Sequence, residues 1–267
     1  MRIARFALAG QDPQYGIIEL AIDGGDHPDT IATLTGDPLA GVAVNYTGER
    51  HELDDVRLLS PVIPRSKIVG VGKNYADHAS EMGGEVPEVP LLFFKPNTSV
   101  IGPNETIIRP EGVNELHFEG ELAVIIGRIC KQVPVERVPE VVFGYTIAND
   151  VTARDWQRAD GQWTRAKGSD TFLPLGPWVN THLTLEEVGK LDIETRLGDE
   201  VRQSGSTSQM VRGVAELIAH ISRSITLLPG DIILTGTPAG VGAMEPGDEV
   251  HVQIDGLGTL SNPVADQ

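Results

Sequence analysis

Two glutamates separated by one residue, Glu119 and Glu121, are the strongest chemical feature of this sequence. They lie in the run 116–122, which continues into the apolar residues 123–126. Because strand side chains alternate between faces, a strand over 116–126 would place His117, Glu119 and Glu121 on one face. Two carboxylates on one face repel each other unless solvent or a cation separates them. A solvated strand face is the ordinary interpretation, so a second acidic site is needed to favour a metal.

Asp150 supplies that second acidic site at the end of another apolar run. If a helix began directly after it, Asp150, Arg154 and Gln157 would share one helical face at i, i+4 and i+7. An acid, a guanidinium and an amide side by side can recognise a carboxylate held by a metal, although an ordinary surface ion pair is the alternative. Three carboxylate ligands suit Mg²⁺ or Mn²⁺, and the lack of Cys/His ligand spacing argues against zinc. We expect His117 to support the ligands rather than join them.

His78 and Glu81 form a second candidate pair, on a short helix that we expect between Tyr75 and Met82. Residues three apart on a helix can touch, and a histidine oriented by a carboxylate is a general base for water. Glycines at positions 70, 72, 83 and 84 flank this helix and would allow it to move as a lid. Taken alone, the pair could equally be a surface contact.

Two further features could bind an anion. Lys167 lies in the run 164–172, where a single lysine would by default face solvent. The glycine-rich turn 234–242 follows a predicted strand and could present backbone N–H groups and the Thr237 hydroxyl, although a plain tight turn would have the same composition.

The elements that must position these residues are mostly short strands. Thirty glycines and 18 prolines separate many short apolar runs, which is typical of a β-rich protein with tight turns. Asp255-Gly256 suggests a hairpin, and apolar residues from Met210 to Ile225 recur at helical spacing after a possible cap at Ser208. A second helix is expected from Thr152 to about Asp160. The predicted strands are Ile17–Ile22, Lys67–Val71, Leu91–Phe94, Leu116–Ile126, Asp231–Leu234 and Val250–Ile254.

Composition narrows the classes of partner. The 267 residues carry a formal net charge of −17, which would repel nucleic acid and anionic membranes. The sequence shows neither a signal peptide nor a stretch near the ~20 apolar residues of a membrane span. The single cysteine, Cys130, cannot form an intramolecular disulfide and is expected to be a packed thiol, which fits a reducing cytoplasm. The stiff segment 60–64 suggests a boundary between a small strand-rich N-terminal domain, 1–60, and a larger domain, 61–267.

Taken together, the motifs resemble the catalytic domain of the fumarylacetoacetate hydrolase superfamily over about residues 67–263. The two departures are Lys73, where the family often has arginine, and Gly120, where it often has a bulky residue. Neither changes a candidate ligand. Six short motifs occur in the family's order: Val71–His78, Phe94–Pro96, His117–Leu122, Asn149–Asp155, Lys167–Phe172 and Gly230–Pro238.

The resemblance implies an α+β, β-rich fold, with a mixed β-roll or β-sandwich, flanking helices and a short lid helix, in a homodimer. It also implies that the first sixty residues are the small N-terminal domain of some bacterial members. By position it makes His78, Glu81 and Lys167 catalytic. It makes Glu119, Glu121 and Asp150 metal ligands, and Arg154, Gln157, Thr237 and Lys95 substrate-binding residues.

The implied activity is metal-dependent cleavage or decarboxylation of a small 2-oxo acid through a metal-bound enolate, as in acylpyruvate hydrolases and oxaloacetate decarboxylases. An isomerase of 2-hydroxyhepta-2,4-diene-1,7-dioate or a decarboxylase of 5-oxopent-3-ene-1,2,5-tricarboxylate, both of aromatic catabolism, is the alternative within the family. A non-catalytic β-roll holding a structural cation is the alternative of another class.

Overall fold

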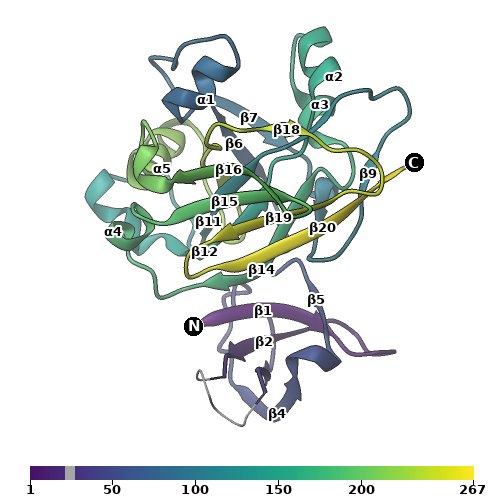
Figure 1. The fold of residues 1–267 in the computed structure, drawn as a ribbon. Coiled ribbons are helices and arrows are strands. Elements are labelled where there is room, and N and C mark those ends of the chain that lie inside the picture. The colour runs from purple at the N-terminus through teal and green to yellow at the C-terminus, as the bar shows by residue number, and fades with distance from the viewer. Residues whose placement is uncertain (22–27) are drawn as a thin grey trace.

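The computed structural model describes residues 1–21 and 28–267, and their strands form three sheets (Figure 1). Twelve strands belong to the largest sheet, whose main path runs β4-β3-β2-β1-β14-β12-β11-β17-β6-β7. Its members are β1 (Arg2–Ala7), β2 (Gln14–Glu19), β3 (Thr30–Leu34), β4 (Tyr46–Glu52), β5 (Arg57–Leu59), β6 (Ile68–Gly72), β7 (Leu91–Lys95), β8 (Val100–Ile101), β11 (Gly120–Ile126), β12 (Val142–Asn149), β14 (Leu173–Asn180) and β17 (Ile232–Leu234).

Two smaller sheets complete the strand structure of the described residues. The three-stranded sheet has β10 (Leu116–Phe118) between β13 (Thr152–Ala153) and β18 (Gly242–Ala243). The five-stranded sheet runs β16 (Glu200–Ser206), β15 (Asp192–Leu197), β19 (Glu249–Ile254), β20 (Gly258–Asp266) and β9 (Ile107–Arg109).

Helices are short in the described part of the chain, and among them no helix combines the length and apolar character that crossing a membrane requires. The strand-rich α+β class expected from the sequence is therefore confirmed. The helices are α1 (Ala76–Glu81), α2 (Arg154–Ala159), α3 (Thr164–Gly168), α4 (Leu185–Val188) and α5 (Val214–Ser224), with 3₁₀ turns η1 (Leu53–Asp55), η2 (Asn97–Ser99), η3 (Val135–Glu140) and η4 (Thr207–Gln209).

Strand β11 lies between β12 and β17 in the largest sheet and is buried along its whole length. Its even-numbered residues Val124 and Ile126 pack in one core cluster with α5 and the five-stranded sheet, while Ala123 and Ile125 pack in another with β14 and β17. Burial on both faces explains why this strand reads as a continuous apolar run instead of an alternating one. A strand held from both sides is a rigid support for a side chain at its end.

The first strands form an extension of the large sheet. Antiparallel pairing of Arg2 with Asn180 joins β1 to β14, and Phe6, Ile18 and Ile31 form a separate small core. In Figure 1 these strands lie at the end of the molecule away from α1, α2 and α3.

Several sequence expectations need correction at element boundaries. The strand predicted for Ile17–Ile22 is β2, which begins earlier and ends at Glu19, and Ile22 lies outside the described residues. Ser208 does not cap the long helix, because it belongs to η4 and α5 begins at Val214. The expected hairpin at Asp255-Gly256 is confirmed between β19 and β20, with Gly256 at φ 72°.

The expected hinge at Gly70 is wrong. Gly70 is paired within β6, between Phe93 of β7 and Leu234 of β17. A Cβ at this position would lie 2.1 Å from the ring of Phe93, so the glycine makes room for an aromatic side chain. Gly72 is also paired, as the last residue of β6, which leaves Gly83 and Gly84 as the glycines beyond the paired strand.

Candidate metal centre and active site

The three carboxylates predicted from the sequence come together where β11 meets β12. Residues 120 and 121 pair with residues 149 and 148, and the backbone N–H of Asp150 donates to the carbonyl of Glu119 at 2.8 Å. Candidate ligand oxygens of Glu119, Glu121 and Asp150 all lie within 4.8 Å of one another, and each residue is at most 4% exposed.

The strand predicted for 116–126 is broken at Glu119, which corrects the expected arrangement of His117. Residues 116–118 form β10 of the three-stranded sheet, and β11 begins at Gly120 in the large sheet. His117 therefore does not continue the face of the two glutamates. Its Nε2 lies 3.1 Å from Glu115, and burial together with the charge of Arg154 lowers the pKa of its imidazole.

Two buried lysines neutralise much of the acidic cluster. Lys167, from α3, donates to Glu119 at 2.7 Å and to Asp150 at 2.6 Å, so it bridges two members of the triad. Lys95, at the end of β7, donates to the other oxygen of Asp150 at 2.5 Å. We predicted substrate contact for Lys95, but the cavity beside the triad is lined without it, so the structure places this amine behind Asp150.

Arg154 provides a third cation, although not from the helical face that we predicted. Residues 152–153 form strand β13, the helix α2 begins at Arg154, and Asp150 precedes both. The expected i, i+4, i+7 face through Asp150 is therefore wrong. Arg154 donates to Glu119 at 2.6 Å and to Gln157, one turn along α2, at 2.8 Å, so these three side chains still converge.

Ionisation within the triad is uneven. Although burial opposes it, the charges of Lys167 and Arg154 hold the pKa of Glu119 well below its usual range. Burial and the neighbouring charges of Asp150 and Glu119 instead raise the pKa of Glu121 well above its usual range. Among the described residues Glu121 takes part in no ion pair, and it accepts a hydrogen bond from the backbone N–H of Gly236 at 2.7 Å.

These observations fit a divalent cation at the triad. Glu121 brings a buried carboxylate that forms no ion pair among the described residues, and a cation close to three carboxylate groups would remove the repulsion between them. All the candidate ligands are carboxylate oxygens, which are the donors that Mg²⁺ and Mn²⁺ prefer.

His78 and Glu81 lie on α1 as predicted. Nδ1 of His78 is 3.2 Å from Glu81, and Glu81 also accepts from the backbone N–H of Gly240 at 3.1 Å. His78 is 6% exposed and lines the same cavity as the triad. With Nδ1 directed to Glu81, Nε2 is the nitrogen that can meet a substrate in the cavity.

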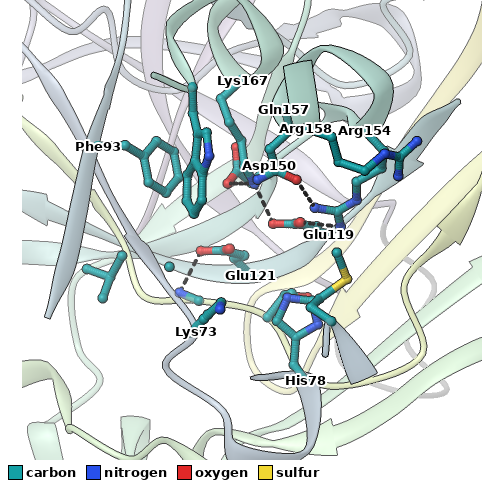
Figure 2. A pocket seen from close by; sticks show the side chains of 16 residues that line it. Lys73, His78, Phe93, Glu119, Glu121, Asp150, Arg154, Gln157, Arg158 and Lys167 are labelled. Atoms are coloured by element: carbon teal, nitrogen blue, oxygen red, sulfur yellow. Dashed lines mark hydrogen bonds and ion pairs between the residues drawn. The ribbon is translucent and has the colours of Figure 1, made fainter. Parts of the chain in front are cut away.

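The cavity has a volume of about 210 Å³ and combines the predicted residues with an aromatic wall. Phe93 and Trp163 form an edge-to-face pair with ring centroids 5.6 Å apart, and the Lys167 amine lies 5.1 Å from the Phe93 ring. Figure 2 shows Arg154, Gln157 and Lys167 along one side of the cavity and Lys73 and His78 along the other.

Thr237 lines the cavity as expected, but protein partners hold its hydroxyl. The hydroxyl donates to the carbonyl of Gly120 at 2.8 Å and accepts from the Gln203 side chain at 2.7 Å. Gln203, which the sequence reasoning missed, also accepts from the N–H of Gly120 at 3.0 Å and donates to Pro238 at 2.8 Å. This fully buried amide therefore ties the turn after β17 to the residue between the two glutamates.

Gly120 is the residue that makes this contact possible. A Cβ there would lie 2.3 Å from the hydroxyl of Thr195 and 3.2 Å from the amide oxygen of Gln203. A larger residue would displace both side chains.

Comparison with known proteins places the chain in context. The fumarylacetoacetate (FAA) hydrolase C-terminal family matches residues 67–265, and the Rv2993c-like N-terminal family matches residues 1–61. Protein Rv2993c of Mycobacterium tuberculosis is 49% identical over 99% of this chain and 98% of its own length. Oxaloacetate tautomerase YisK of Bacillus subtilis is 43% identical over 80% of this chain and 75% of its own length.

Two crystal structures extend the comparison. The 2-hydroxyhepta-2,4-diene-1,7-dioate isomerase from Mycobacterium marinum is 44% identical with a TM-score of 0.89. The match covers 100% of this chain and 99% of the isomerase chain. The maleylpyruvate hydrolase from Sphingobium sp. SYK-6, in complex with manganese(II) and pyruvate, is 32% identical with a TM-score of 0.79 over 100% and 99% of the two chains.

Proposed function

The chain belongs to the fumarylacetoacetate hydrolase family, and we propose that it moves a proton at C3 of a small 2-oxo acid, interconverting the keto and enol forms of a substrate such as oxaloacetate. The observation that carries this proposal is the position of His78, a buried histidine oriented by Glu81, in the cavity that the carboxylate triad also lines. Similarity to proteins described as an oxaloacetate tautomerase and a dienedioate isomerase supports proton transfer as the chemistry.

Each group of the site has a task in this proposal. Glu119, Glu121 and Asp150 would hold Mg²⁺ or Mn²⁺, which supplies a Lewis acid that favours loss of a proton next to the keto group. His78 accepts the C3 proton at Nε2 and delivers it to the oxygen on C2, which gives the enol, and the reverse transfer regenerates the keto form. Glu81 keeps the imidazole in the required tautomer. Arg154 and Gln157 bind the carboxylate of the substrate, and Lys167 holds Glu119 and Asp150 in place.

Cleavage of the C3–C4 bond, by hydrolysis or decarboxylation, is a second candidate. It is the reaction type we expected from the sequence, and similarity to a maleylpyruvate hydrolase favours it. Hydrolysis would require His78 to take a proton from water instead of from C3 of the substrate. The position of His78 in the cavity is compatible with either role. A purely structural cation, the alternative of another class, fits less well because Arg154, Lys167 and His78 all surround a cavity large enough for a small molecule.

The test is exchange of the C3 hydrogens of oxaloacetate with D₂O, followed by NMR in the presence of Mg²⁺ and corrected for the protein-free rate. We expect His78→Gln to slow exchange by about 100-fold or more, within the range for a lost general base. His220→Gln, on α5 and outside the cavity, is the matched control and should exchange at the wild-type rate. Wild-type exchange in the His78 variant would contradict the assignment.

If His78→Gln abolishes acylpyruvate cleavage but leaves oxaloacetate exchange intact, the second candidate is correct. Loss of exchange with no cleavage activity in the wild type would support the first candidate alone.

A further inference from the structure

Lys73 is a cation that lines the cavity and has no ion-pair partner among the described residues. Four lysine and arginine side chains line the cavity, and three of them contact carboxylates: Arg154 and Lys167 contact Glu119, and Arg158 contacts Glu115. Among the described residues no ion pair or hydrogen bond engages the amine of Lys73. Its side chain is half-buried and lines the cavity.

The backbone brings Lys73 to the cavity at the cost of conformational strain. Lys73 follows the last residue of β6 and has φ of 57°, the left-handed region that side chains other than glycine rarely adopt. It is the one cavity-lining residue among the non-glycine residues with positive φ in the described chain. Strained backbone of this kind tends to persist where it places a functional side chain.

Capping of the lid helix does not explain this lysine. The amine lies against Gly84, where a Cβ would be 2.4 Å away from it, near the end of α1. However, the last carbonyls of α1 already accept from backbone N–H groups: Met82 donates to His78, Gly83 to Ser80 and Gly84 to Ala79, at 2.9 to 3.0 Å. Among the described residues no hydrogen bond joins the Lys73 amine to these carbonyls, so the amine is available to a ligand in the cavity.

Charge balance indicates what that ligand carries. Arg154, Lys95 and Lys167 equal the three carboxylates in number, although none of them contacts Glu121, so a divalent cation would leave two positive charges in excess in the buried site. The carboxylate of a 2-oxo acid and the negative charge that develops on its keto oxygen would offset those two charges. Lys73 then remains, on the side of the cavity opposite Arg154 and Gln157 (Figure 2).

We propose that Lys73 forms a second carboxylate subsite that makes this enzyme selective for 2-oxo dicarboxylic acids over 2-oxo monocarboxylic acids. The inference rests on the proposed function, because it takes the C1–C2 end of the substrate to lie at the triad. The far carboxylate accepts a charge-assisted hydrogen bond from the Lys73 amine, and the substrate then spans the cavity between α2 and the segment before α1. The apolar surfaces of Phe93 and Trp163 pack against the carbon chain between the two ends.

The experiment compares oxaloacetate with 2-oxobutanoate, in which a methyl group replaces the second carboxylate. C3 hydrogen exchange of both compounds is measured with Mg²⁺ for the wild type, Lys73→Met, Lys73→Arg and Lys131→Met. Lys131 is an exposed lysine outside the cavity, so its variant controls for loss of one charge from the whole molecule. We expect Lys73→Met to reduce the preference for oxaloacetate, as a ratio of kcat/KM values, by about 10- to 100-fold, the range of one charge-assisted hydrogen bond.

Lys73→Arg should retain most of the preference, and Lys131→Met should leave it at the wild-type value. An unchanged ratio in Lys73→Met, or an equal fall in Lys131→Met, would overturn the subsite.

A second measurement separates this inference from the proposed function. If the wild type exchanges neither compound, proton transfer is the wrong reaction, and the subsite is judged by calorimetric titration of Mg²⁺-loaded protein with the same two acids. Tighter binding of oxaloacetate that disappears in Lys73→Met supports the subsite, and equal affinities in the wild type overturn it. Oxalate, which is too short to span the cavity, should bind the wild type and Lys73→Met alike.

Discussion

Glu121 illustrates how three similar carboxylates acquire different surroundings. Glu119 contacts Arg154 and Lys167, and Asp150 contacts Lys95 and Lys167, whereas Glu121 faces the backbone N–H of Gly236. A buried carboxylate next to two others is costly unless a cation joins it. The residue that destabilises the metal-free site is thus the one that would contribute most to binding a cation.

Glu121→Gln should therefore separate metal binding from stability. We expect a loss in Mn²⁺ affinity of about 100-fold or more, because removing a ligand exceeds the 10- to 100-fold typical of groups that only support ligands. The melting temperature in EDTA should not fall, because the amide relieves repulsion from Glu119 and Asp150. Calorimetric titration with Mn²⁺ measures the affinity, and circular dichroism measures the melting temperature in EDTA. The control is Glu186→Gln, at an exposed glutamate. Tight Mn²⁺ binding by Glu121→Gln would show that the cation is held elsewhere.

Residue types and spacing allowed the three carboxylates and the pair of His78 and Glu81 to be found from the sequence. The contacts made by the lysines could not be found in this way. Glu-x-Glu and His-x-x-Glu are local patterns whose geometry follows from strand and helix periods. Lys95 and Lys167 reach Asp150 from elements that are 55 and 17 residues away in sequence, so only tertiary structure reveals them. The charge of Lys73 was likewise visible, but the lack of a partner was not.

At the scale of elements, the interruption at Glu119 is the feature that strand periodicity could not predict. The sequence around it alternates as one strand would, yet β10 and β11 belong to different sheets. Two side chains hold the backbone at this interruption. Thr237, in the turn after β17, donates to the carbonyl of Gly120, and Gln203 accepts from the N–H of Gly120 and donates to Thr237. We infer that Gln203 positions the two glutamates without contacting a substrate.

Gln203→Leu tests that positioning role. Removing the amide leaves the N–H of Gly120 and the carbonyl of Pro238 unpaired in a buried place, so Mn²⁺ affinity should fall by about 10- to 100-fold, as for other groups that support ligands. The matched control is Gln253→Leu, on the exposed side of β19. A purely structural role predicts a lower melting temperature with unchanged Mn²⁺ affinity, so that combination would contradict the inference. Gln203→Glu, which can still accept from Gly120, should recover part of the affinity.

The whole molecule presents an electrostatic contrast between surface and site. Its net charge of −17 opposes approach of an anionic substrate, but screening over about 8–10 Å at physiological salt confines that effect near the surface. Inside the cavity Arg154, Lys167 and Lys73 place positive charges beside the three carboxylates, and a divalent cation held there would make the local field positive. The fold class could be anticipated from composition because frequent glycine and proline between short apolar runs favours strands. The pairing of β1 with β14 could not be anticipated from the sequence, because nothing in either segment specifies its partner strand.

We also propose that the protein is a homodimer, as the sequence resemblance implied. Light scattering coupled to size-exclusion chromatography should then give a mass about twice the 28.7 kDa of one chain. The mass should not change with Mg²⁺ or EDTA, because the triad lies entirely within one chain. A mass of one chain at micromolar concentration would contradict the proposal.

The central claim is that a divalent cation at Glu119, Glu121 and Asp150 enables proton transfer on a 2-oxo acid, and metal removal tests it most directly. Protein is dialysed against EDTA, shown to be metal-free by elemental analysis, and assayed for C3 exchange of oxaloacetate before and after addition of Mg²⁺ or Mn²⁺, with the protein-free rate subtracted. The account predicts loss of about 100-fold or more in the metal-free protein, recovery with either cation, and no recovery in Glu121→Gln. Full exchange by metal-free wild-type protein would contradict it.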